Sequence, residues 1–172
     1  MNNPGDQIIS AITNRNVELF DSMLATPEGV KCYDDNIFDY IDLIIKYNEI
    51  DFVKVLISRG LIYNPVVGIC SPILDYAIGL KNTEIVKIIL DSLPGPYEFS
   101  DGLFSSAVYT NSLDMLKLIY YHPNFKAEER DIYVRRHINI AIGNKNSEMV
   151  NMLYEIYASH GVDVNNCAER VR

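Results

Sequence analysis

The sequence predicts an all-α protein, a helical solenoid of about five helix-turn-helix repeats joined by short loop fingers. Five stretches align in register, and an acidic residue falls in each at position 18, 51, 84, 114 or 148. The resulting spacings of 33, 33, 30 and 34 residues are typical of a repeat that contains two helices. Apolar residues within the stretches recur at i, i+3 and i+4, and the alternation expected of strands is missing.

Each repeat is expected to hold two short helices with a tight break between them. The first helix ends in a small or polar pair such as Lys81-Asn82 or Lys145-Asn146. Asn suits this place because it tolerates left-handed backbone and can cap a helix end. The acidic residue then favours the first turn of the second helix. The apolar stripe of that helix is too wide for one hairpin to bury, so neighbouring repeats must stack on it.

Several short motifs resemble those of ankyrin repeats. Gly161-Val162-Asp163-Val164-Asn165 is similar to the end of such a repeat, Arg59-Gly60-Leu61-Ile62-Tyr63-Asn64 is a weaker match, and Ser71-Pro72-Ile73 approximates Thr-Pro-Leu. The chain therefore resembles divergent ankyrin-repeat proteins over residues 7–166. Its richness in Asn, Ile and Tyr is similar to that of ankyrin proteins encoded by large DNA viruses, protists and intracellular bacteria.

The resemblance implies one ankyrin-repeat domain over residues 1–172. Two connections, Ala25–Tyr40 and Pro123–Val134, depart from the family pattern, and we expect Glu128–His137 to lengthen the first helix of the last repeat. The repeats are expected at approximately 7–25, 40–60, 72–93, 102–122 and 132–160, followed by a polar tail at 166–172.

Charge and composition exclude several classes of protein. With 15 Lys and Arg against 23 Asp and Glu, the net charge of −8 opposes binding to nucleic acid. The basic cluster Arg135-Arg136-His137 is interpreted as part of a mixed, solvated face. No secretory leader and no apolar run of membrane-spanning length is found. Three scattered cysteines, Cys32, Cys70 and Cys167, indicate a reduced compartment, so we expect a cytoplasmic protein that is not secreted.

Catalysis is not expected. The sequence has no phosphate-binding glycine motif, no nucleophile elbow and no His-Glu-x-x-His. His122, His137 and His160 follow no metal-ligand spacing, and no Cys-x-x-Cys occurs. Cys32 is interpreted as structural, because no neighbouring histidine is evident that would activate it. We therefore predict no catalytic residues, no metal and no cofactor.

The family resemblance also implies where a partner would bind. In ankyrin arrays the two positions after the small-apolar pair of the first helix face the concave groove, and Tyr is enriched at binding hot spots. Loop tips with exposed apolar side chains are the other candidates. The alternative is that these side chains only cover local backbone or pack beneath their loops. The candidates are Lys46, Tyr47, Leu80, Tyr109 and Thr110 in the groove and Val66, Val67, Tyr97 and Phe99 at the loop tips.

The predicted function is that of an intracellular protein-protein interaction module, which acts stoichiometrically as an adaptor, decoy or inhibitor. Its acidity favours a partner with a basic surface. The alternative is a self-associating structural protein, because the last repeat is expected to lack a polar capping helix. A homodimer would then form end to end through Met149, Met152, Leu153 and Ile156.

Overall fold

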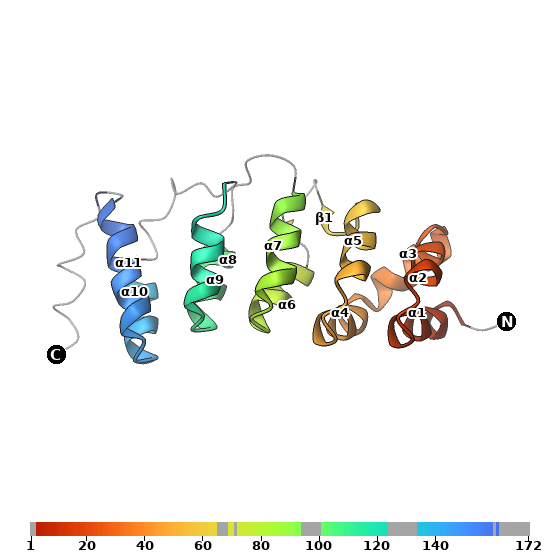
Figure 1. Cartoon of the computed structure of the whole chain (residues 1–172), viewed down its shortest axis with the longest axis horizontal. Helices are drawn as coiled ribbons and strands as arrows, with labels where there is room; N and C mark the ends of the chain where they lie inside the picture. Colours follow the sequence, from red (N-terminus) through yellow and green to blue (C-terminus); the bar gives the residue numbers. More distant parts are fainter. Residues whose placement is uncertain are drawn as a thin grey trace. The chain divides into compact units, whose positions relative to one another are not determined.

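Helices make up nearly all of the regular structure in the computed structural model, which describes residues 3–64, 69–70, 72–93, 101–123, 134–159 and 161. The prediction of an all-α protein is confirmed. Contacts divide the chain into two compact units, Met1–Leu93 and Pro94–Arg172. The first contains α1 (Pro4–Thr13), α2 (Val17–Leu24), α3 (Pro27–Asp35), α4 (Ile37–Lys46), α5 (Ile50–Ser58), β1 (Tyr63–Asn64), β2 (Ile69–Cys70), α6 (Pro72–Gly79) and α7 (Thr83–Ser92) (Figure 1). The second contains α8 (Asp101–Tyr109), α9 (Leu113–Tyr120), α10 (Val134–Gly143) and α11 (Ser147–Ser159).

The break between the two helices of each hairpin is a single residue in left-handed conformation. Its amide donates to the carbonyl three residues back. In the hairpins of Arg15, Asn48, Lys81 and Lys145, the next amide reaches the carbonyl five residues back, as Asn82 N does to Ala77 O at 2.9 Å. Two otherwise unsatisfied carbonyls of the first helix are bonded in this way. The five left-handed residues are Arg15 (φ 55°), Asn48 (53°), Lys81 (58°), Asn111 (54°) and Lys145 (56°).

Asn takes both of the expected roles, since Asn48 and Asn111 are left-handed and the Asn of the other three hairpins caps a helix. The left-handed residue in the first, third and fifth hairpins is Arg or Lys, and the Asn that follows caps the second helix instead. The side-chain oxygen of Asn82, for example, accepts from Ile85 N at 3.0 Å. An Asn side chain offers such an acceptor and a Lys side chain does not, so the cap position selects Asn more strongly than the left-handed position does.

The core of the first unit lies between neighbouring hairpins. The first helices α1, α4 and α6 pack on one another in order, and so do the second helices α2, α5 and α7 (Figure 1). Phe20 and Phe52 meet edge to face across α2 and α5, with ring centroids 4.9 Å apart. Each fully buried apolar side chain of this kind contributes about 1.5–3 kcal/mol. In the second unit α8 packs on α9 and α10, and α10 packs on α11.

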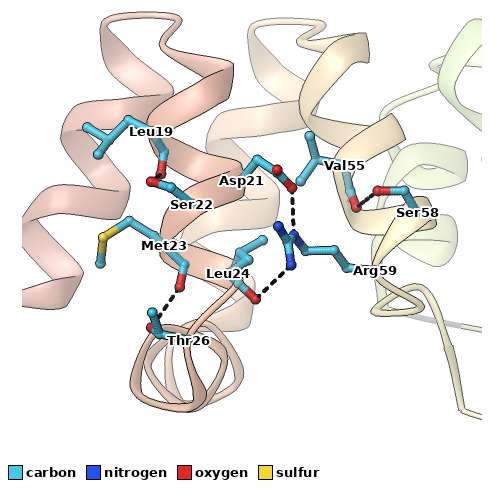
Figure 2. Close-up of polar contacts among 9 residues, drawn as sticks. All are labelled: Leu19, Asp21, Ser22, Met23, Leu24, Thr26, Val55, Ser58 and Arg59. Atoms are coloured by element: carbon cyan, nitrogen blue, oxygen red, sulfur yellow. Dashed lines mark hydrogen bonds and ion pairs between the residues drawn. The ribbon is translucent and has the colours of Figure 1, made fainter.

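An ion pair also joins two hairpins of the first unit. Arg59 lies at the C-terminal end of α5 and reaches α2, where its Nε donates to Asp21 Oδ1 at 2.6 Å (Figure 2). Its Nη1 donates to the carbonyl of Leu24, at the end of α2, at 3.4 Å. The hydrogen bond from Arg59 lowers the pKa of Asp21. Both side chains keep water contact, so the pair mainly fixes how the two helix ends meet.

The helix α3 was not predicted from the sequence. Thr26 begins it, since its Oγ1 accepts from Gly29 N at 3.1 Å and Pro27 follows at the first helical position. Oγ1 of Thr26 also donates to the carbonyl of Met23 at 2.9 Å (Figure 2). α3 packs on α1 and α2, and Gly29 makes the close approach possible, because a Cβ there would lie 1.9 Å from Met23 O.

We expect Gly29→Ala to lower the free energy of unfolding by about 1–3 kcal/mol, since the added methyl group has to push α3 away from α2. Gly79→Ala is the matched control in the same unit. Its Cβ would meet nothing within 4 Å, so that change should be neutral or stabilise by about 0.5–1 kcal/mol. Urea denaturation followed by circular dichroism measures both. Equal stability of the Gly29→Ala protein and wild type would contradict the close packing.

Candidate functional site

The turns between first and second helices in the first unit present apolar side chains to solvent. Lys46 is the last residue of α4, Tyr47 follows it, and Leu80 follows α6. Tyr47 and Leu80 each directly precede a left-handed residue, so they occupy equivalent positions in neighbouring hairpins. The left-handed turn carries both outward, and their exposed fractions are 50% and 51%.

An open groove of about 570 Å³ lies beside these turns. Its walls come from the end of α4, the turn after α6 and the start of α7. Ile45, which is 3% exposed, belongs to the core. The groove is lined by Ile45, Lys46, Asn48, Leu80, Lys81, Asn82, Thr83 and Glu84. It therefore combines an apolar patch with amide, hydroxyl, ammonium and carboxylate groups, as ligand sites commonly do.

A chain of hydrogen bonds between the two hairpins shapes the groove. Nδ2 of Asn82 donates to Oδ1 of Asn48 at 2.8 Å, and Nδ2 of Asn48 donates to Glu84 Oε2 at 3.2 Å. Asn82 also caps α7, so one side chain both starts its own helix and fixes the preceding turn. This asparagine ladder, Asn48–Asn82, holds the two turns that carry Tyr47 and Leu80 in fixed register.

Similar contacts join other turns. Arg15 Nε pairs with Glu49 Oε1 at 2.7 Å between the first two hairpins. In the second unit Nδ2 of Asn146 donates to Asn111 Oδ1 at 2.8 Å. The turns are thus linked by side chains from the left-handed position of one hairpin and the cap position of the next. Sequence reasoning missed this role, although the Asn residues at 48 and 82 and at 111 and 146 already followed the repeat.

The second unit holds the other two groove candidates. Tyr109 ends α8 and is 50% exposed, and the guanidinium carbon of Arg136 lies 5.4 Å from its ring centroid. Thr110 is half-buried, and its hydroxyl donates to Ala107 O at 2.9 Å. The structure thus brings Lys46 and Leu80 into one groove. Tyr47 lies in the same turn as Lys46 but is not part of the lining, and Tyr109 and Thr110 belong to the other unit. Val66, Val67, Tyr97 and Phe99 lie outside the described residues.

His137 does not belong to a solvated face, which corrects the interpretation of Arg135-Arg136-His137. It is 1% exposed and lies between Ser105 Oγ and Tyr157 Oη, each 2.7 Å from a ring nitrogen. The reason is the helical period: on α10 Arg136 points outward and His137 inward. A Ser–His contact of this length is one element of a nucleophilic site. Here it ties α8 to α10 and α11 inside the core.

The C-terminal helix gives no support to the predicted homodimer surface. Met149, Met152, Leu153 and Ile156 are 0%, 7%, 0% and 4% exposed, because this side of α11 faces inward, with α11 packed on α10. Self-association stays a prediction, and these four side chains do not supply its surface.

No protein-family model, no curated protein and no solved structure matches the chain. Among the described residues, no three His, Cys, Asp or Glu side chains gather as metal ligands would. In the same part of the chain, every helix is too short or too polar to cross a lipid bilayer.

We expect Asn82→Ala to lower the free energy of unfolding by about 1–2 kcal/mol, because it removes both the cap of α7 and the bond to Asn48. Asn82→Ser keeps a capping oxygen but loses the donor, so its effect should be smaller, about 0.5–1 kcal/mol. Asn16→Ala, which removes a cap alone, serves as the control. Urea titrations compare the three, and unchanged stability of Asn82→Ala would contradict the asparagine ladder.

Proposed function

We propose that the chain is a protein-protein interaction module of the ankyrin-repeat type, a helical solenoid that acts stoichiometrically as an adaptor, decoy or inhibitor. One observation carries the proposal. Tyr47 and Leu80 occupy equivalent positions of neighbouring hairpins and are half-exposed, and Leu80 lines the groove beside the two turns. Their apolar character is not required by the turn, since Asn14 and Asn144 occupy the same position in other hairpins.

The residue types at the groove support protein binding. A tyrosine offers a large apolar ring and a hydrogen-bonding hydroxyl, and such residues recur where binding energy is concentrated. The asparagine ladder holds the two turns, so little ordering is needed when a partner arrives. A rigid surface with exposed anchors is the usual form of a preorganised binding site.

The proposal also includes a cellular location and a preference for the charge of the partner's surface. The cysteine content supports a reducing, cytoplasmic location, and Cys32 is a free thiol. The net charge of −8 favours partners whose surface is basic outside the groove, because opposite potentials speed encounter.

The test is affinity capture from the cytoplasm of the cells that make the protein, followed by binding measurements on the captured protein. We expect the Tyr47→Ala/Leu80→Ala variant to bind it at least about tenfold more weakly, since truncated hot-spot side chains change affinity by more than about 1 kcal/mol.

Tyr121→Ala is the matched control, because Tyr121 also follows a helix end and is 69% exposed. It should bind as wild type does, and circular dichroism should show equal helicity in all three proteins. If the double variant kept wild-type affinity, the groove would not be the binding surface.

A further inference from the structure

Building on the proposed function, we propose that the groove at Lys46 and Leu80 binds a short partner segment with a carboxylate beside an aliphatic or aromatic side chain. The bound segment of the partner would thus be acidic, although this protein also carries a net negative charge. Two features carry this inference: two lysines that make no ion pair within the described residues, and an exposed apolar side chain in the same lining.

Lys46 and Lys81 line the groove, and both residues are exposed. Within the part of the chain that the structure describes, neither makes an ion pair, whereas Lys54 and Lys87 each have a carboxylate within 3.0 Å. The lining thus holds two lysines and one carboxylate, that of Glu84, so its formal charge is positive although the chain as a whole is acidic.

The preceding turn has a different charge pattern. Between the first two hairpins, Glu49 occupies the position after the left-handed residue and neutralises Arg15 at 2.7 Å. In the next hairpin Asn82 occupies that position and bonds to neutral Asn48. The third hairpin thus keeps the ladder but lacks the carboxylate. Glu84, the acidic residue of the groove lining, accepts from Asn48 at 3.2 Å.

The apolar part of the lining comes from Leu80 and Ile45. Leu80 is 51% exposed, and Ile45, which is 3% exposed, belongs to the core. Leu80 is therefore the apolar side chain of the lining that a bound segment can cover.

Apolar contact and charge have different tasks in such a site. The contact with Leu80 and Tyr47 supplies most of the affinity, because exposed ion pairs are weak. The lysines supply selectivity, since they attract a carboxylate and repel a basic side chain at short range. Salt screens the repulsion from the remaining acidic residues beyond about 8 Å at physiological ionic strength.

The probe is a random dodecapeptide library displayed on phage and selected against the full chain. We expect the selected peptides to be enriched in Asp or Glu next to Leu, Ile, Phe or Tyr. Their affinity should fall by about tenfold or more in the Lys46→Glu/Lys81→Glu variant and should also fall with rising salt.

Lys54→Glu/Lys87→Glu is the matched control, with the same net charge as the groove variant and both changes on second helices of the same unit. It should retain affinity within about twofold, since long-range repulsion alone is weak at physiological salt. Enrichment of Lys or Arg, equal loss in both variants, or failure to select any peptide that needs the groove would overturn the inference. Peptides that depend on Tyr47 and Leu80 but tolerate the groove charge reversal would overturn it and leave the proposed function standing.

Discussion

The left-handed residue between the two helices of each hairpin is the constraint on which the rest of the structure depends. A non-glycine residue in this conformation is unfavourable by about 1–2 kcal/mol, and two backbone hydrogen bonds to the first helix offset that penalty. The acceptor of the longer bond is a buried small or apolar residue, such as Ala11, Ala77 or Ala141. One turn therefore fixes what is buried four residues before it and what is exposed directly before it.

The same turn connects the fold to the candidate site. The residue before it points outward, and in two neighbouring hairpins that residue is Tyr47 or Leu80. The residue after it caps the second helix and, where it is Asn82, also bonds to the preceding turn. The exposure of Tyr47 and Leu80 and the fixed separation of their turns thus both result from the left-handed turn and the residues beside it. Asn82 stands where the second hairpin has Glu49, so no carboxylate directly follows Lys81.

Much of this could be predicted from the sequence because it is local and periodic. The repeat register predicts the helices, the core of the second helices and the place of each turn. The asparagine ladder is not local, since it joins residues 34 positions apart, and a pattern of single positions does not show which side chains meet. The helix α3 was missed because the segment Ala25–Tyr40 was compared only with the turn pattern of ankyrin repeats. Thr26 and Pro27 are nevertheless a normal helix start. His137 was misplaced because neighbouring charges were grouped by sequence and not by helix face.

Hydrogen–deuterium exchange of the full chain, with and without the captured partner, tests most directly whether binding occurs at the first-unit groove. The turns at 46–49 and 80–83 contain backbone amides that a bound segment would cover. We expect slower exchange at both turns, with little change in α9 and α11. Protection confined to the second unit, or no protection at either turn, would contradict it.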